Sequence, residues 1–137
     1  MGAKADGGGE DMGVKESQEN YLECILHLLR MKGFARSVDI AAELRVTKPS
    51  VSFAMRQLRE QGYILMDSKN LISLTDSGMD VARRMSERHE GIARVLIRMG
   101  VDAQTAYQDA CRIEHDISQQ TFEALQKLDR DGILPPA

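Results

Sequence analysis

The sequence predicts a mainly α-helical protein with one small β-hairpin. Apolar residues recur at helical spacing in six segments, and two short β-prone runs flank a polar loop near the middle of the chain. The chain has 137 residues, enough for one domain or two small lobes, and it is 42% hydrophobic and 28% charged. This ordinary globular composition excludes collagen, coiled-coil rods and wholesale disorder.

The N-terminal half carries three predicted helices. Residues 1–16 hold five glycines and no apolar period, so we expect a disordered tail there. A helix over Gln18–Met31 follows, and a second helix over Ser37–Leu44 takes Ser37 as its N-cap. A tight connection leads to Thr47, which caps a third helix with Pro49 in its first turn. Two helices joined by three or four residues are typical of a helix-turn-helix.

The β-hairpin follows these helices. Strands over Tyr63–Met66 and Leu71–Leu74 flank the polar loop, as in the wing of a winged helix-turn-helix. Three further helices are predicted over Asp76–Met99, Ala103–His115 and Gln119–Leu128, with Asp102 and Ser118 as the N-caps of the last two. The expected architecture is therefore a winged helix-turn-helix followed by a helical lobe.

Charge separates the two halves of the chain. Residues 32–63 hold six basic and three acidic side chains, whereas residues 101–137 hold three basic and seven acidic ones. This asymmetry suggests two different tasks. We expect two domains, the winged helix-turn-helix over residues 17–75 and the helical lobe over residues 76–137.

The third predicted helix has a polar face suited to double-stranded DNA. Short hydroxyl groups and long donors lie off its apolar stripe, and such groups reach base edges and phosphates in the major groove. Ser50, Ser52 and Gln57 are expected to approach bases, and Lys48 and Arg56 to hold phosphates. The full predicted set of DNA-contacting residues is Arg36, Lys48, Ser50, Ser52, Arg56 and Gln57.

A second group of residues has metal-ligand chemistry. Cys111, Glu114 and His115 are spaced i, i+3 and i+4, which places them on one face of a helix. A thiolate, a carboxylate and an imidazole are ligands for transition metals. Further candidates stand on the first helix and on the long fourth helix: Asn20, Glu23 and His89.

The last two predicted helices carry an apolar stripe that a small lobe cannot bury alone. We therefore expect a homodimer with Ile117, Phe122 and Leu125 in its interface. A dimer of helix-turn-helix units requires a pseudo-palindromic operator with half-sites about one helical turn apart, or a multiple of that.

The cysteine content favours a reducing compartment. Cys24 and Cys111 are too few for a disulfide scaffold and no secretory signal is visible, so we expect a cytoplasmic protein. No apolar run approaches the roughly 20 residues that a membrane span needs, and no membrane association is expected.

The order of elements and several motifs resemble the diphtheria toxin repressor and manganese transport regulator family of metal-dependent repressors. The resemblance covers Ser17 to Leu128, and its most specific motif, Cys-x-x-Glu-His, lies within Asp109–His115. The other similar segments are Asn20–Glu23, Ala41–Leu44, Leu74–Gly78 and Arg88–Glu90. The resemblance implies an N-terminal winged helix, a helical dimerisation lobe and metal sites at their junction, in the short form without an SH3-like domain.

The resemblance also implies a ligand set. Two carboxylates and two imidazoles would hold one metal, and the residues at those positions are Glu23, His89, Glu114 and His115. The implied metal is Mn(II) or Fe(II), with Co(II) or Zn(II) as surrogates, and the sequence leaves the choice open.

The neighbouring metal site departs from both branches of the family. The manganese branch has Asp and Glu where this chain has Asn20 and Cys111, and the iron branch has Met and Cys there. The remaining second-site His and Glu of the iron branch fall on Tyr107 and Ala93, which are poor ligands. We therefore expect an altered or absent second site, in which Cys111 and Asn20 tune metal choice.

Two other functions are weighed against a metal-activated repressor. A winged-helix dimer could regulate transcription without metal, and a DNA affinity that responds to metal would distinguish the two. A metalloenzyme would need an open coordination position and a positioned base or nucleophile in a cleft. No second constellation supplies these groups, so no enzyme activity is expected.

Overall fold

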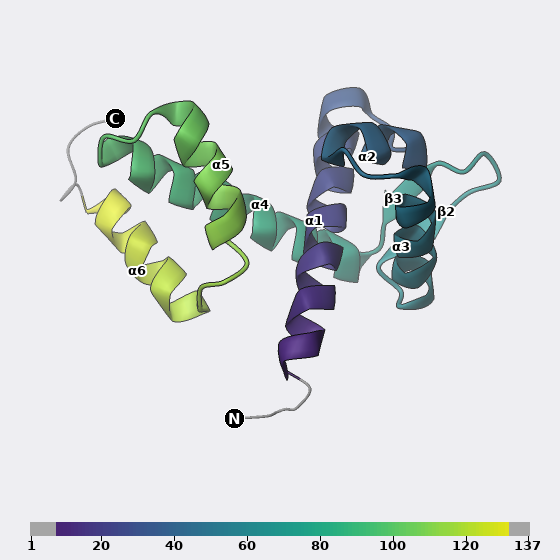
Figure 1. The fold of residues 1–137 in the computed structure, drawn as a ribbon, viewed down its shortest axis with the longest axis horizontal. Helices are drawn as coiled ribbons and strands as arrows, with labels where there is room; N and C mark the ends of the chain where they lie inside the picture. The colour runs from purple at the N-terminus through teal and green to yellow at the C-terminus, as the bar shows by residue number, and fades with distance from the viewer. Residues whose placement is uncertain (1–7, 132–137) are drawn as a thin grey trace. The chain divides into compact units, whose positions relative to one another are not determined.

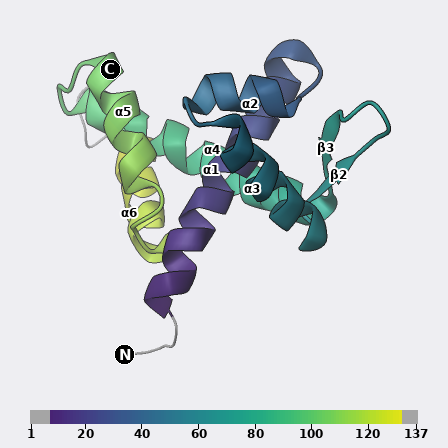
Figure 2. The same cartoon turned by 45° about the vertical axis from the view of Figure 1, so that its right-hand side comes forward.

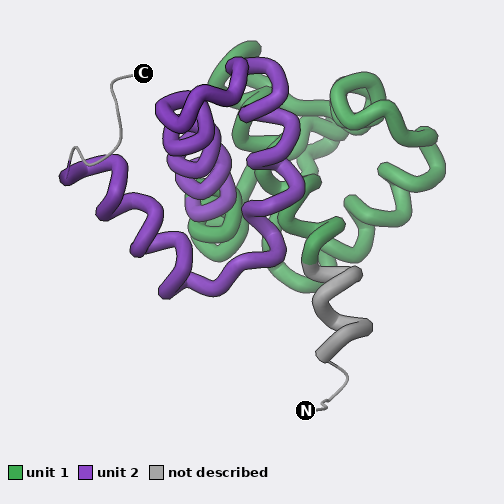
Figure 3. Tube along the Cα trace, turned by 60° about the vertical axis from the view of Figure 1, so that its left-hand side comes forward, with its two compact units in different colours: residues 1–83 green, residues 84–137 purple. Residues whose placement is uncertain are grey.

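The computed structural model describes residues 8–131, with side chains from Glu16 onward. It confirms a mainly α-helical chain with one small two-stranded sheet (Figure 1). The chain divides into two compact units, residues 1–83 and residues 84–137 (Figure 3). This division lies within the helix α4 (Asp76–Arg98), beyond the 75/76 boundary predicted for the domains.

Helix α1 (Gly8–Lys32) supplies one wall of the first unit. It begins before the predicted Gln18, and residues 1–7 of the expected tail lie outside the described residues. Leu22 and Ile25 on this helix are fully buried in the core of the unit, where Cys24 also lies. Burial raises the pKa of the Cys24 thiol to about 12, which makes it an inert core residue.

The helix-turn-helix consists of α2 (Ser37–Leu44) and α3 (Lys48–Glu60). The prediction that Ser37 caps α2 is wrong, because the N-cap is Arg36 and Ser37 is the first helical residue. The backbone of Arg36 is extended, and its guanidinium Nε donates to Asp39 Oδ2 at 3.1 Å. The Arg36 side chain makes no capping hydrogen bond, because arginine has only donors and cannot accept from a backbone N–H.

A left-handed residue joins the two helices. Arg45 has φ 57°, and the Val46 N–H donates to the Ala41 carbonyl at 3.1 Å to close α2. Thr47 then caps α3, since its hydroxyl oxygen accepts from the Ser50 N–H at 3.3 Å, as predicted. The connection therefore turns sharply without a glycine.

The wing is an antiparallel pair of short strands, β2 (Ile64–Met66) and β3 (Ile72–Leu74), with Ile64 opposite Leu74. Figure 2 shows its loop extending away from the helices of this unit. The Asp67 carboxylate closes the loop by accepting from the Lys69 and Leu71 N–H groups at 2.8 and 2.9 Å. The Ile72 N–H donates to the Ala35 carbonyl at 2.9 Å, so the wing is tied to the backbone next to Arg36.

A close backbone approach joins the wing to the start of α4. The Thr75 N–H donates to the Tyr63 carbonyl at 3.1 Å, and the Thr75 hydroxyl caps α4 by accepting from the Gly78 N–H at 3.2 Å. A Cβ atom at Gly78 would overlap the Tyr63 carbonyl oxygen. Glycine is therefore required at this position for packing.

The second unit contains the rest of α4 together with α5 (Ala103–Ile113) and α6 (Gln119–Arg130). Asp102 and Ser118 cap the two shorter helices, as predicted. The core of the unit is small and holds Ile92, Ala93, Ala110 and Phe122. Helix α5 ends two residues before the predicted His115, so Glu114 is its C-cap and His115 lies in the following turn.

Charged residues hold the end of α6 to α4. The Asp129 carboxylate accepts from Arg94 Nε and from an Arg98 guanidinium nitrogen, both at 2.8 Å. These two guanidinium groups lower the pKa of Asp129 below its ordinary value. None of the described helices is both long enough and apolar enough to cross a membrane.

Candidate metal centre and nucleic-acid interface

A buried carboxylate flanked by two imidazoles forms the chemical centre of the second unit. The Glu114 side chain is 0% exposed, and its Oε2 lies 3.2 Å from Nδ1 of His89 on α4. Its Oε1 lies 3.3 Å from Nε2 of His115, whose side chain is 2% exposed. The structure therefore brings together three of the predicted metal ligands, one from α4 and two from the end of α5.

The burial of Glu114 favours a cation at this place. A carboxylate removed from water is costly unless it is paired or bonded to donors. Within the described part of the chain, the ion-pair partners of Glu114 are the two imidazoles, which are charged only if protonated. Two neutral imidazoles and one carboxylate instead form a donor set suited to a divalent transition metal.

An arginine holds the backbone beneath these ligands. Arg88 is buried, and its Nη1 donates to the carbonyl oxygens of Glu114 and Ile117 at 2.9 and 3.0 Å. Its Nη2 donates to Gln119 Oε1 at 2.9 Å, and its guanidinium lies 5.5 Å from the centre of the Phe122 ring. Arg88 and His89 are consecutive residues of α4. Arg88 contacts the backbone carbonyl of Glu114, and His89 lies beside the Glu114 carboxylate. The role of Arg88 was not predicted from its place in the Arg-His-Glu motif.

The other predicted ligands have different surroundings. Cys111 lies on α5 one turn before Glu114. Its side chain is exposed, whereas those of Glu114 and His115 are buried. Asn20 and Glu23 are half-buried on α1 in the first unit. His27, to which no function was assigned, is exposed. Tyr107, at the position that the iron branch would fill with histidine, lies beside His89 with 5.6 Å between their ring centres.

The predicted DNA-contacting residues lie on the surface of the first unit. Five of them are exposed and one is half-buried, whereas the opposite face of α3 buries Val51, Met55 and Leu58 in the core. Phe53 stands on the same outer side of α3 and is 56% exposed. The exposed residues are Arg36, Lys48, Ser50, Ser52 and Arg56, and the half-buried one is Gln57.

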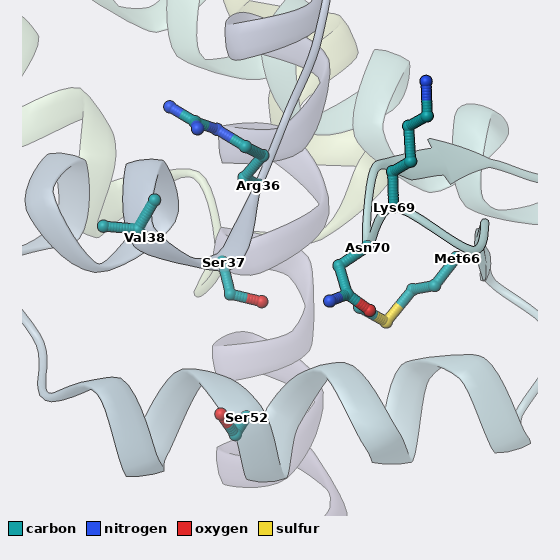
Figure 4. A pocket seen from close by; sticks show the side chains of 7 residues that line it. All are labelled: Arg36, Ser37, Val38, Ser52, Met66, Lys69 and Asn70. Atoms are coloured by element: carbon teal, nitrogen blue, oxygen red, sulfur yellow. The ribbon is translucent and has the colours of Figure 1, made fainter.

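A hollow of about 470 Å³ lies between the wing and α3, the predicted DNA-contacting helix. Figure 4 shows the Ser37 hydroxyl and the Asn70 amide facing one another across it, with Ser52 of α3 below. Arg36 and Lys69 extend along one edge. Sequence reasoning identified Arg36 and Ser52 but missed the wing residues. The turn-forming segment Asp67–Asn70, whose asparagine has φ 64°, was the available signal.

The residues predicted for the dimer interface are largely packed within their own unit. Phe122 is 4% exposed and belongs to the core of the second unit, where its ring faces Gly91 of α4. Ile117 and Leu125 are half-buried against the same core. The outermost member of the stripe is Leu128, which is 36% exposed. The interface itself stays a prediction.

Comparison with known proteins covers both units. Residues 14–70 match the N-terminal DNA binding domain of the iron dependent repressors, and residues 75–129 match their metal binding and dimerisation domain. The transcriptional regulator MntR of Escherichia coli strain CFT073 is 35% identical over 112 residues, which cover 82% of this chain and 72% of that protein. The HTH-type transcriptional regulator MntR of Bacillus subtilis is 33% identical over 112 residues, covering 82% and 79%.

Solved structures give the same relationship. A crystal structure of the metal-dependent transcriptional regulator MtsR has a TM-score of 0.76 and 26% identity, covering 82% of this chain and 53% of that one. The IdeR structure from T. acidophilum has a TM-score of 0.71 and 26% identity, covering 86% and 55%. The chain thus spans about half the length of these solved relatives. With both domain profiles matched in order and a relative 35% identical over most of its length, this chain belongs to the iron dependent repressor family of metal-dependent transcriptional regulators.

Proposed function

We propose that this protein is a homodimeric repressor that binds a pseudo-palindromic operator when it is loaded with Mn(II) or Fe(II). The observation that carries the proposal is the fully buried Glu114 carboxylate between the imidazoles of His89 and His115. A divalent cation there would neutralise a carboxylate that is otherwise buried without a permanently charged partner. Relatives named as metal-dependent or manganese regulators support the same assignment.

Glu23 of α1 completes the proposed ligand set. It is half-buried, and the family resemblance assigns it to the same metal as His89, Glu114 and His115. Because Glu23 belongs to the DNA-binding unit and the other three belong to the second unit, a shared metal would restrain the two units together. Metal would then favour the spacing of the two DNA-contacting helices that the operator requires. Coupling of this kind typically amounts to about 1–3 kcal/mol and is reciprocal, so operator DNA should tighten metal binding.

The DNA surface of the first unit supports the other half of the proposal. Ser50, Ser52 and Gln57 of α3 would approach base edges, and the exposed Phe53 offers an apolar contact for a thymine methyl group. Lys48 and Arg56 would hold phosphates. The wing-side hollow extends this surface to Lys69 and Asn70.

The test is the response of operator binding to metal. Binding is measured after treatment with EDTA and then with Mn(II), Fe(II), Co(II) and Zn(II) in turn. His115→Ala removes a nitrogen ligand from the buried centre, so it should abolish metal-stimulated operator binding and leave weak nonspecific binding intact. His27→Ala is the matched control, because His27 is exposed on α1 and lies outside the proposed ligand set.

The outcome separates the two regulatory functions. If His115→Ala binds metal and operator as the wild type does, the metal-sensing proposal is wrong. Operator binding that ignores EDTA and every metal would instead favour the metal-independent winged-helix dimer.

Cys111 and Asn20 are proposed to set metal choice and stoichiometry. The exposed thiol of Cys111 favours softer ions than a carboxylate does. Cys111→Glu restores the residue of the manganese branch and should shift the response towards Mn(II). Titration calorimetry in reducing buffer would show whether a second equivalent binds, and an unchanged metal preference would remove Cys111 from the site.

The proposed dimer interface has to be tested with a substitution on the surface of the second unit. Phe122→Asp would place a charge in the unit's own core, so loss of dimers would not distinguish the interface from the fold. Leu128→Asp alters an exposed side chain of the same stripe and should leave the helical content unchanged while shifting sedimentation towards monomers. A folded variant that stays dimeric would place the interface elsewhere.

A further inference from the structure

Tyr107 contacts one of the proposed metal ligands and is itself held by the next residue of that ligand's helix. Its ring centre lies 5.6 Å from that of His89, with 44° between the ring planes. Its hydroxyl donates to Glu90 Oε1 at 3.3 Å. Glu90 follows His89 on α4, so Tyr107 on α5 contacts two consecutive side chains of the facing helix within the same unit.

This contact affects the orientation of the His89 imidazole towards a bound metal ion. A histidine side chain rotates about two torsions, and only some of its rotamers direct a given ring nitrogen at a bound ion. In the structure, Nδ1 of His89 lies 3.2 Å from Oε2 of Glu114 without forming a hydrogen bond to it. An aromatic neighbour packed on the ring restricts its rotation, and groups that orient a ligand contribute to metal affinity.

Glu90 keeps Tyr107 in place. Its carboxylate accepts the phenolic hydrogen, and its negative charge raises the pKa of Tyr107 above the ordinary value. The Tyr107 side chain is otherwise largely open to solvent, since the residue is 40% exposed.

We propose that Tyr107 is a positioning residue that fixes the ring of His89 for metal binding, and that Glu90 anchors Tyr107 against that ring. The inference rests on the proposed function, because it assigns His89 as a ligand. In the iron branch, the position of Tyr107 is a histidine that binds the neighbouring metal. In this chain, the same position would instead orient His89, a ligand of the site formed with Glu114 and His115.

The experiment compares Tyr107→Leu, which removes the aromatic contact, with Tyr107→Phe, which keeps the ring and removes the bond to Glu90. Calorimetry on the full chain should show the Mn(II) dissociation constant rising about 3- to 10-fold in Tyr107→Leu. The rise should be smaller in Tyr107→Phe and in Glu90→Gln. Gln104→Leu is the matched control, because Gln104 is an exposed residue one turn earlier on α5.

A second readout needs no metal. Side-chain NMR of the metal-free protein should show the His89 ring in one orientation in the wild type and in Tyr107→Phe, and averaged over several in Tyr107→Leu. The thermal midpoint without metal should stay the same in all variants, because Tyr107 is half exposed. This readout decides the inference even if the wild type binds neither Mn(II) nor Fe(II), an outcome that would contradict the proposed function.

Two results would overturn the inference. One is a Tyr107→Leu variant with wild-type Mn(II) affinity and an ordered His89 ring. The other is an equal loss of affinity in Gln104→Leu, which would show that α5 responds to any substitution on its surface.

Discussion

The two units place their functional residues in opposite environments. In the first unit, most of the residues proposed to contact DNA are exposed on α3, and a separate apolar core beneath them holds Val51, Met55 and Leu58. In the second unit, the proposed ligands Glu114 and His115 are themselves buried, and the apolar core beside them is small. The proposed DNA contacts of the first unit therefore lie outside its core, whereas the proposed ligands of the second unit lie in its interior, where a buried carboxylate costs folding free energy.

This difference predicts how each unit tolerates change. A surface side chain on a rigid core can be removed with little effect on folding, because nothing packs on it. A substitution at a buried ligand changes the free energy of unfolding as well as metal binding, because a buried carboxylate without hydrogen-bond donors is costly to the folded state. Four substitutions test this contrast, and they follow in order of decreasing effect.

The largest effect is expected at Glu114. Glu114→Gln keeps the shape of the side chain but removes the charge, so affinity for Mn(II) should fall by about 100-fold, the upper end of what loss of a site group costs. Without metal, the same variant should be as stable as the wild type or more stable, because an amide is easier to bury than a carboxylate. Calorimetry and chemical denaturation in EDTA measure the two quantities. A destabilised variant without metal would show that the carboxylate supports the fold of the second unit.

The second effect concerns the first unit and involves no ligand. Gly78→Ala places a Cβ atom against the Tyr63 carbonyl oxygen, and backbone cannot move aside as a flexible side chain can. The free energy of unfolding should fall by about 1–3 kcal/mol, as for other overpacked sites. Chemical denaturation measures the loss, with Gly33→Ala as a control that tests positive φ without a clash. Equal losses in both variants would contradict the proposed overlap.

The third effect separates binding from folding on α3. Arg56→Ala should weaken binding to all DNA sequences to a similar degree and lower the slope of affinity against salt by about 1, as the loss of one phosphate contact does. Its free energy of unfolding should stay within about 0.5 kcal/mol of the wild type, because Arg56 is exposed. Arg30→Ala, an exposed arginine on α1, is the control. An unchanged salt slope would count against a phosphate role for Arg56.

The smallest effect depends on pH and concerns the ion pairs at the end of α6. The pKa of Asp129 is lowered in the folded state, chiefly by Arg98, so its contribution to stability is present above the ordinary aspartate pKa of about 3.9. That contribution disappears as the pH falls through the lowered value. Asp129→Asn should therefore be slightly less stable than the wild type at pH 7, and this difference should be smaller at pH 3.

Denaturation at both pH values measures this difference, and Asp131→Asn serves as the control because Asp131 is exposed two residues later. A difference of the same size at pH 3 would mean that Asp129 acts through hydrogen bonds that do not need its charge.

Much of the architecture is encoded locally and was predictable from the sequence. The caps at Thr47, Asp102 and Ser118 are confirmed, because a cap depends on a side chain and a backbone N–H only two or three residues away. The hairpin and the three helices after it were likewise placed within a few residues of their observed bounds. Ser37 is the exception, because its residue type and position fit an N-cap but the helix begins one residue earlier than predicted. Two contacts lie at this helix start: the Arg36 guanidinium donates to Asp39, and the Ile72 N–H of the wing donates to the Ala35 carbonyl.

Chemical type and spacing also identified the ligand candidates, but only the tertiary structure separated them. His89 and Glu114 are 25 positions apart in sequence, and the packing of α4 against α5 brings Nδ1 and Oε2 to 3.2 Å. Cys111 and Glu114 have ideal helical spacing, yet one is exposed and the other fully buried. Periodicity specifies which residues share a helical face, whereas the burial of each residue depends on what the rest of the chain packs against that face. For the same reason, only the folded unit revealed that Arg88 holds the Glu114 backbone and that Tyr107 lies on His89.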